Sequence, residues 1–398
     1  MNSIDRMMGK HKTLCFLPSI MLLVSLLSFV SSSPDDKGFE RLVTWMRQQG
    51  GRVDDRIDVI VFDNGIRGMV ALEDIEEGAE LLLCPWKLVM GSTSFGDQMK
   101  GGDSMCAVVQ EMAHEIRQGK NSLWYPYLDH IELPRLLSTW DQSALDELQG
   151  LSPYQDATRH LRWLSESCDA SFEDSHDKTA VERALISFVS RASEVGMIPI
   201  YDLVNHHNGK RNAKLRLTKE GAQLIVVGGP IPKRQEIYQS YGIKTASTMY
   251  LNYGFVEEWP TCWNFKDSDS SDNFAFISFP DDVVAINPTA DLIREVWHAN
   301  MPLVAYQSLA NGHMESLSSE DLLRFAQAAE THLARFPTTA REDEILLAEA
   351  TRLGQQDRAS AIEYRRAFKT SLETARNSCN MAASARDKEV EGSGYSEL

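Results

Sequence analysis

The order of apolar and polar residues predicts a small β unit near the start of the chain. Between residues 39 and 49, apolar residues recur at helical spacing, and Gly50-Gly51 ends that pattern. Two segments rich in Val, Ile and Leu follow, at 57–62 and 80–89, and both are expected to be strands. Glycine-bearing turns lie between them, so we expect short strands joined by tight connections.

The next region has a helical pattern. Residues 104–118 and 179–193 each place their apolar side chains on one helical face. Strand-like segments then return, at 197–200, 214–217, 223–227 and 236–240. The stretch from about 94 to 192 is therefore expected to be a helical insertion between two β portions.

The third region is again helical. Ser318 with Asp321, and Thr339 with Glu342, have the spacing of capping boxes at helix N-termini. A last helix is expected to carry Ala361, Tyr364, Phe368, Leu372 and Ala375 on its apolar face. Residues 379–398 are polar and without periodicity, which predicts a disordered tail.

The N-terminus has the pattern of a targeting segment. Lys10, His11 and Lys12 precede an uncharged run whose apolar part spans 14–30, and small residues follow at 31–33. This order predicts a signal peptide over residues 1–33, with entry into the secretory pathway or targeting to an organelle. An uncleaved membrane anchor is the alternative, because the apolar run is long for a signal.

Composition limits the class of partner. Lys and Arg number 40 against 57 Asp and Glu, a net charge of −17, which argues against nucleic acid as a partner. The charge fits a basic protein or peptide substrate, although plain solubility explains it as well. The six cysteines show no metal-ligand spacing, so no metal site is expected, and without a disulfide framework most are expected to be free thiols.

Three segments carry candidate chemistry: 64–71, 198–206, and 241–242 together with 251–255. Taken singly, each has an ordinary structural explanation. Two glycines at a hairpin are usual turn chemistry, an Asn-His pair after an apolar run is often a paired buried group, and aromatics beside glycines usually pack.

Together, in this order, the segments resemble the SET-domain proteins related to the Rubisco large-subunit methyltransferase. The insertion adds Ser122-Leu123-Trp124-Tyr125-Pro126-Tyr127-Leu128, Ser190-Arg191-Ala192 precedes the Asn-His segment, and Phe336-Pro337-Thr338-Thr339 lies in the C-terminal helices. The similarity covers about residues 39–378. It implies an α+β fold, with a SET domain of small sheets at 39–265 and the insertion within it. An all-helical domain at 266–378, similar to that subfamily's substrate-binding domain, would follow.

The resemblance also implies an activity. The chain would be an S-adenosylmethionine-dependent protein-lysine N-methyltransferase acting on a non-histone protein held by the SET channel and the C-terminal helices. Such an in-line methyl transfer depends mainly on alignment and exclusion of water. The residues implied to hold the cofactor are Gly65, Ile66, Arg67, Arg191, Asp202, Asn205 and His206. Those implied to be catalytic are Tyr253, the active-site tyrosine, and Tyr241, which would line the lysine channel.

One departure and two alternatives stay open. Arg67 stands where the family often has a second glycine or a small apolar residue, which matters little if that position contributes only backbone. A protein-histidine methyltransferase is the first alternative, although the branch with that activity replaces the residue at Tyr253. A catalytically inactive SET-fold binding module is the second.

Overall fold

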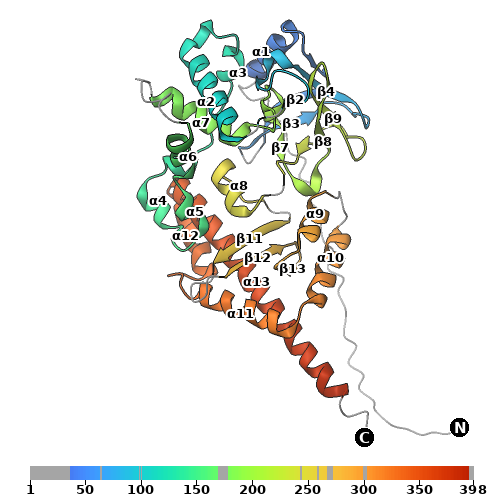
Figure 1. The fold of residues 1–398 in the computed structure, drawn as a ribbon, viewed down its shortest axis with the longest axis vertical. Helices are drawn as coiled ribbons and strands as arrows, with labels where there is room; N and C mark the ends of the chain where they lie inside the picture. The colour runs from blue at the N-terminus through green and yellow to red at the C-terminus, as the bar shows by residue number, and fades with distance from the viewer. Residues whose placement is uncertain are drawn as a thin grey trace, which may run out of the picture.

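The computed structural model describes residues 36–393 apart from 63–64, 98, 100, 169–177, 243, 258–259, 267–271 and 299–302. The predicted signal segment at 1–33 lies outside these residues. The molecule has an N-terminal half of small sheets and helices and a C-terminal half dominated by helices, with one helix, α8 (Ala246–Tyr253), between them (Figure 1).

A four-stranded antiparallel sheet forms the largest β element of the N-terminal half, with strand order β1-β4-β9-β8. Its strands are β1 (Arg52–Val53), β4 (Glu80–Pro85), β8 (Ala213–Leu217) and β9 (Gly221–Val226). Because β4 precedes the helical insertion and β9 follows it, their pairing joins the two β portions into one unit.

Three two-stranded sheets complete this half. The pairs β2–β3 and β5–β6 are antiparallel, and β7–β10 is parallel. Their bounds are β2 (Ile57–Val61), β3 (Arg67–Ala71), β5 (Met90–Gly91), β6 (Gly196–Met197), β7 (Asn205–His206) and β10 (Tyr238–Gln239). The strand expected at 197–200 is thus limited to its first residue, because the chain then turns into a 3₁₀ segment, η5 (Tyr201–Leu203).

The predicted insertion is helical. Besides α1 (Asp36–Gln48), which precedes it, the helices of this half are α2 (Gly101–Gln118), α3 (Tyr125–Leu128), α4 (Gln142–Asp146), α5 (Ser152–Asp156), α6 (Arg159–Ser167) and α7 (Lys178–Arg191). Helices α2 and α7 pack together and share one hydrophobic core with the β strands, through Val109, Leu185 and Leu224. Burial of these apolar faces is the main stabilising contribution here.

A disulfide joins Cys106 of α2 to Cys168 at the end of α6. The expectation that most cysteines are free thiols therefore fails for this pair. The sequence could not show it, because the two residues lie 62 positions apart and meet only when the insertion folds. Cys84, Cys262 and Cys379 are buried free thiols.

The C-terminal half contains a sheet as well as helices. An antiparallel sheet, β11-β12-β13, is formed by β11 (Thr261–Lys266), β12 (Asn273–Ser278) and β13 (Val284–Ile286). The prediction of an all-helical domain from residue 266 is therefore wrong for its first part. The helices are α9 (Ala290–His298), α10 (Leu303–Ser316), α11 (Ser319–Leu333), α12 (Ala340–Arg352) and α13 (Gln356–Ser393).

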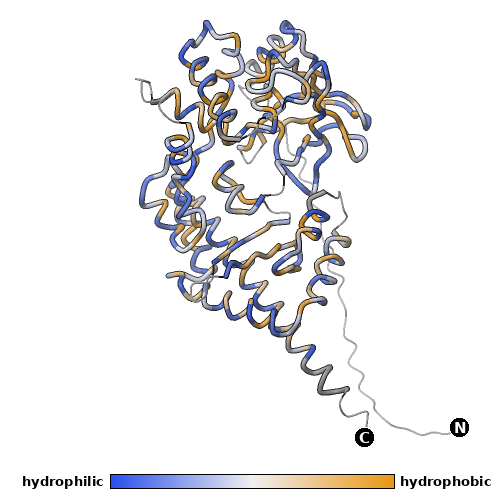
Figure 2. Tube along the Cα trace, viewed as in Figure 1, coloured by the Kyte–Doolittle hydropathy of each residue, from blue (hydrophilic) through white to orange (hydrophobic). Residues whose placement is uncertain are grey.

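Both predicted capping boxes are present, at Ser318 with Asp321 and at Thr339 with Glu342. Along these helices hydrophobic and hydrophilic residues alternate, so each has a polar side (Figure 2). The predicted disordered tail is wrong up to residue 393, because α13 continues through it with Cys379 and Ala383 buried against the core. Within the described part of the chain, no helix combines the length and apolarity that a membrane span needs.

A second hydrophobic core ties α8 to both the insertion and the C-terminal half. Tyr250 of α8 lies between two aromatic side chains, with ring centroids 6.0 Å from Trp140 and 4.5 Å from Tyr364. Trp263 of β11 packs against Phe368 of α13 at 5.6 Å in the same core. The C-terminal helices thus support the element that carries Tyr253, so they are not a separable appendage.

A buried charged network strengthens this junction. Asp343 of α12 is fully buried and lies 2.7 Å from both Arg365 and Lys369 of α13. Arg365 also reaches Glu147, at the end of α4 in the insertion, at 2.6 Å. Because each buried charge has an opposite partner, the network fixes the C-terminal helices against the insertion.

Candidate active site

The Asn-His motif forms the short strand β7 at the centre of the N-terminal half. Ile200, just before η5, has φ = 71°, a conformation that a β-branched residue rarely adopts. Such strain persists only where the surrounding structure enforces it. The unusual conformation of Ile200 turns the chain into η5, whose Tyr201 and Asp202 line the site.

The side-chain amide of Asn205 joins three segments. Its Nδ2 donates to the backbone carbonyl of Arg67 at 2.7 Å and to Oε1 of Glu236 at 2.8 Å. Glu236 also accepts from the hydroxyl of Tyr238 at 2.6 Å. Burial raises the pKa of Glu236 despite these donors. Both hydrogens of the Asn205 amide are therefore used within the protein, and among the described residues its Oδ1 has no donor, so it can accept from a ligand.

His206 positions one of the two predicted tyrosines. Its Nδ1 accepts from the backbone N–H of Tyr241 at 2.8 Å, so the ring proton belongs on Nε2, which lies 3.0 Å from a carboxylate oxygen of Glu257. Glu257 also accepts from the backbone and side chain of Asn208, each at 2.9 Å. No sequence pattern points to Glu236 or Glu257, because single acidic residues outside the motifs resemble ordinary surface charges.

Tyr241 and Tyr253 form an aromatic pair. Their ring centroids are 4.7 Å apart, and Phe255 lies 6.2 Å from Tyr253. The Tyr241 hydroxyl donates to the carbonyl of Val204 at 3.1 Å. Tyr253 is the last residue of α8, whose C-cap Gly254 is left-handed at φ = 79°, a role that suits glycine.

Both phenols are protonated at neutral pH, as ordinary tyrosines are, and burial reinforces this. Burial raises the pKa of Tyr253 to about 12 and that of Tyr241 further above its ordinary value. A neutral phenol presents an oxygen and an aromatic face without a full negative charge. The pair is therefore suited to a cationic or partly cationic centre beside its hydroxyls and exposed ring faces.

Arg191 and Asp202 are coupled beneath the pair. The carboxylate of Asp202 is fully buried, accepts from the Tyr127 hydroxyl at 2.9 Å and lies 3.6 Å from Arg191. Burial raises the pKa of Asp202 although Arg191 and Tyr127 oppose that shift. Arg191 also donates to the backbone carbonyls of Asp202 and Glu132, at 3.1 and 2.7 Å. Arg191, implied by the resemblance to hold the cofactor, therefore faces a buried carboxylate of the protein itself.

The first motif is only partly at the site. Arg67 lines a cavity, and its Nη1 lies 3.5 Å from Nε2 of His130 and 3.7 Å from a carboxylate oxygen of Glu132. Gly65, at φ = 78°, forms the turn, and Ile66 is 55% exposed, but neither lines the cavities described below. Asp63 and Asn64 lie outside the described residues.

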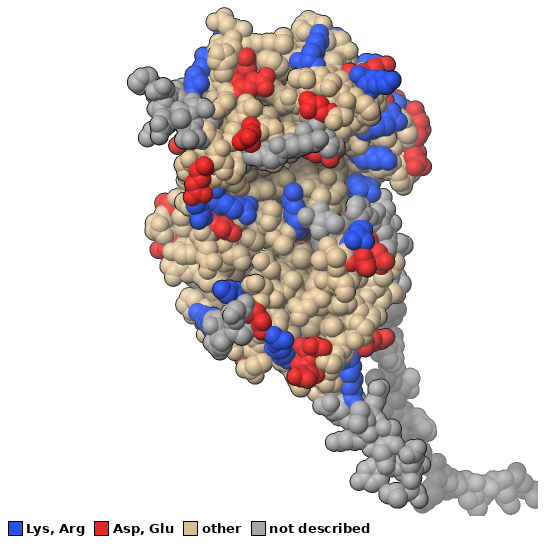
Figure 3. Space-filling view, in the orientation of Figure 1, with Lys and Arg blue, Asp and Glu red and all other residues tan. Residues whose placement is uncertain are grey.

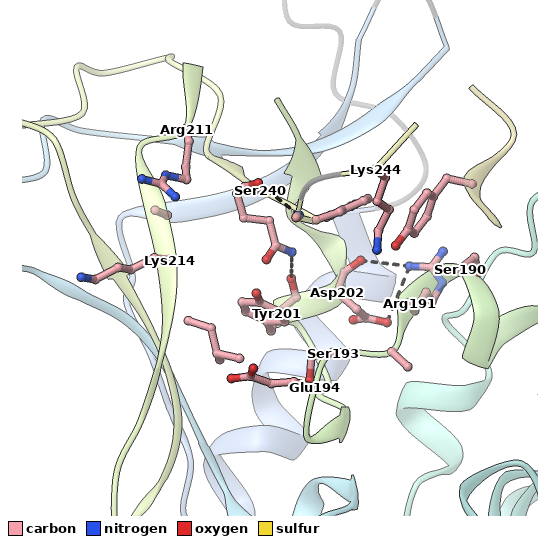
Figure 4. Close-up of a pocket in the computed structure, with 17 residues that line it drawn as sticks. Ser190, Arg191, Ser193, Glu194, Tyr201, Asp202, Arg211, Lys214, Ser240 and Lys244 are labelled. Carbon is pink, nitrogen blue, oxygen red and sulfur yellow. Dashed lines mark hydrogen bonds and ion pairs between the residues drawn. The ribbon is translucent and has the colours of Figure 1, made fainter. Parts of the chain in front are cut away.

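Two cavities formed by the described residues meet at the tyrosine pair. The first, here called the Asn205 cavity, has a volume of about 280 Å³. Besides Asn205, its lining includes Arg67, Glu132, Leu133, Pro134 and Phe255. The second, called the Lys214 cavity, has a volume of about 380 Å³ and is lined by Glu194, Arg211, Lys214, Ser240 and Lys244 (Figure 4). The two share five lining residues: Ser190, Arg191, Asp202, Tyr241 and Tyr253.

Most predicted site residues are therefore brought together. Arg67, Arg191, Asp202, Asn205, Tyr241 and Tyr253 line one or both cavities, and His206 supports Tyr241 from behind. Glu132, Leu133 and Pro134, which also line the Asn205 cavity, were not predicted as site residues. Their place in the wall depends on how the insertion folds back, which no local pattern reveals.

Comparison with known proteins identifies the fold. No family model and no curated protein sequence matches the chain. A crystal structure of the SET domain of LSMT bound to lysine and AdoHcy is similar, with 15% identity, a TM-score of 0.58, and coverage of 92% of this chain and 98% of that one. A structure of Rubisco LSMT bound to AdoMet shows 16% identity, a TM-score of 0.57 and the same coverage. The chain has the SET-domain fold.

Proposed function

We propose that the protein is an S-adenosylmethionine-dependent protein-lysine N-methyltransferase of the Rubisco methyltransferase subfamily, acting on a non-histone protein. The observation that carries this proposal is the pair of cavities meeting at Tyr241 and Tyr253. A methyl donor in one cavity and a lysine in the other would face each other across the rings. Methyl transfer between two ligands needs that in-line approach from opposite sides.

The Asn205 cavity fits the cofactor. It combines Leu133, Pro134 and Phe255, which suit a flat adenine ring, with the cationic Arg67, which suits a carboxylate. The free Oδ1 of Asn205 is an acceptor for the cofactor's amino group. The cofactor supplies the reactive methyl group, while the chain supplies orientation and exclusion of water.

The tyrosines would act on the lysine side. Their neutral hydroxyls and ring faces stabilise the positive charge that moves between the two ligands. His206 and the Val204 carbonyl fix the orientation of Tyr241, so these contacts position it without touching the reacting atoms. Arg191 holds the carbonyls of Asp202 and Glu132 in place at the wall shared by both cavities.

The test is transfer of a labelled methyl group. Purified protein is incubated with labelled S-adenosylmethionine and a total protein extract, beside a Tyr253→Phe variant and a matched Tyr154→Phe control in α5. Label transferred by the wild type and the control, but not by Tyr253→Phe, supports the proposal. No transfer by the wild type above Tyr253→Phe supports the inactive binding module.

The C-terminal helices would contribute to docking of the protein substrate, in keeping with the Rubisco-type resemblance. They also support α8 through Tyr364, so their removal would destabilise the site itself. The docking role is therefore tested by charge-changing substitutions on exposed positions of α12, such as Arg341→Glu. A rise in KM for intact substrate, with unchanged KM for a short peptide, supports docking.

We also propose that the chain enters the secretory pathway or an organelle through residues 1–33, as a cleaved signal or a membrane anchor. The Cys106–Cys168 disulfide supports an oxidising compartment, because such bonds are rare where thiols are kept reduced. Mass spectrometry of the protein from its natural source, run without reductant, tests both points. A mature chain that retains Met1 in a soluble fraction, with Cys106 and Cys168 reduced, would contradict this location.

A further inference from the structure

The Lys214 cavity has a basic rim although the chain is strongly acidic. Its ionisable lining residues include Arg211, Lys214 and Lys244 against Glu194, while Arg191 and the buried Asp202 compensate each other in its depth. The net charge of the whole chain is −17. The side where the proposed function places the lysine substrate therefore carries the opposite charge from the molecule as a whole.

The basic residues come from different segments and bracket the opening. Arg211 lies two residues before β8, Lys214 is the second residue of β8, and Lys244 directly precedes Thr245, the N-cap of α8. Figure 4 shows Arg211 and Lys214 on one side of Tyr201 and Asp202, and Lys244 on the other. On the molecular surface, a run of Lys and Arg side chains lies along one edge of the N-terminal half (Figure 3).

Two of these cations have no partner among the described residues. Neither Lys214 nor Lys244 makes a hydrogen bond or ion pair there, although Lys244 is half-buried. Burial lowers the pKa of Lys244, which makes its charged form less favourable than that of an exposed lysine. A partly buried amine without a partner is costly, and a carboxylate from a ligand would remove that cost.

Resting on the proposed function, we propose that the substrate of this site is a lysine within an acidic segment, whose flanking carboxylates bind Arg211, Lys214 and Lys244. The net charge of the whole chain favours a basic substrate, but the rim of this cavity is basic and favours an acidic one. Contacts of this kind form in the ground state and the transition state alike, so they lower KM more than they raise kcat. They also weaken as salt screens the charges.

The experiment compares three peptides that share a central lysine and differ only in its flanks, which carry Asp and Glu, Asn and Gln, or Lys and Arg. Binding of each dye-labelled peptide is measured by fluorescence anisotropy, and methylation by mass spectrometry. We expect the acidic peptide to bind best, by on the order of tenfold over the basic one at low salt, as three partly exposed ion pairs would give. High salt should reduce this preference.

Charge reversal supplies the matched comparison. Arg211→Glu with Lys214→Glu should shift the preference toward the basic peptide, whereas Lys219→Glu, an exposed change in the turn after β8, should leave the order unchanged. Binding of S-adenosylhomocysteine verifies that each variant is folded. Equal or reversed binding of the peptides by the wild type, no measurable binding of the acidic peptide, or an unchanged preference in the folded double variant would overturn the inference. Methylation of no peptide and no extract protein, despite preferred binding of the acidic peptide, would instead contradict the proposed function alone.

Discussion

The amide nitrogen of Asn205 donates a 2.7 Å hydrogen bond to the backbone carbonyl of Arg67, across 138 positions of sequence. Its second hydrogen goes to Glu236. This residue therefore joins the segments before and after the insertion at the wall of one cavity. Its position explains why two weak motifs, one a glycine-bearing turn and one an Asn-His pair, belong to a single site.

Asn205→Ala should weaken cofactor binding. The change removes the Oδ1 acceptor and leaves the half-buried Glu236 without one of its donors, at a cost of roughly 1–3 kcal/mol. Calorimetry with S-adenosylhomocysteine measures the affinity. Asn208→Ala, next to the site but bonded to Glu257, is the comparison for general loss of packing. An unchanged affinity in Asn205→Ala would mean that the cofactor binds elsewhere.

Gly68→Ala should disturb the same contact from the other side. A Cβ at this position would lie 2.8 Å from Nδ2 of Asn205 and 2.8 Å from a ring carbon of Phe62, and it would also clash with Glu236. We expect at least a tenfold loss of cofactor affinity, as for the loss of one buried hydrogen bond. Gly312→Ala in α10 is the matched control, because a Cβ there meets open space. Equal affinity in both variants would show that the site tolerates the displacement.

Asp343→Asn should destabilise the protein and reduce its acid sensitivity. Burial alone would raise the pKa of Asp343, but hydrogen bonds from Arg365 and Lys369 outweigh it and lower that pKa below the ordinary 3.8. A lowered carboxyl pKa stabilises the fold above the ordinary value, and this stabilisation is lost as the pH falls through the lowered value. At pH 7 the variant should lose about 3–5 kcal/mol of unfolding free energy.

Urea unfolding at pH 7 and at successive pH values below 4 measures this difference. The wild type should lose stability over that acid range more steeply than the variant. Parallel loss of stability in the two proteins would show that Asp343 does not contribute the acid-dependent term.

Reduction of the Cys106–Cys168 disulfide should destabilise the insertion. The disulfide closes a loop of 62 residues and so restricts the unfolded chain. Its loss should lower the free energy of unfolding by about 4 kcal/mol through the entropy of that chain alone. Helix α6, which ends at this disulfide, also holds Asn252 beside Tyr253, through Arg159 at 3.2 Å and His160 at 3.0 Å. Thermal unfolding with and without reductant tests the effect, with a Cys106→Ala, Cys168→Ala variant as the comparison. If reductant lowers the Tm of that variant as much as the wild type's, the disulfide is not the cause.

The sequence predicted much of the fold because its signals are local. Capping boxes, the helices of the insertion and the strands that became β8 and β9 depend on neighbouring residues. The disulfide and residues 132–134 of the site depend on distant contacts, whereas the β11-β12-β13 sheet pairs consecutive strands and was missed although it is local. The helix through residue 393 was missed because its polar surface masks the small buried face formed by Cys379 and Ala383. The sequence could identify Arg67 as a site position but not its contact with Asn205. That contact is made by the backbone carbonyl of Arg67, which does not depend on the side-chain type.

The most direct test of the account is to identify the residue that receives the methyl group. The wild-type protein is incubated with a deuterated-methyl cofactor and an extract, and the labelled peptides are sequenced by tandem mass spectrometry. We expect labelled lysines that are absent with Tyr253→Phe and present with Tyr154→Phe. Label on histidine, or on no residue above the Tyr253→Phe background, would contradict the proposed function.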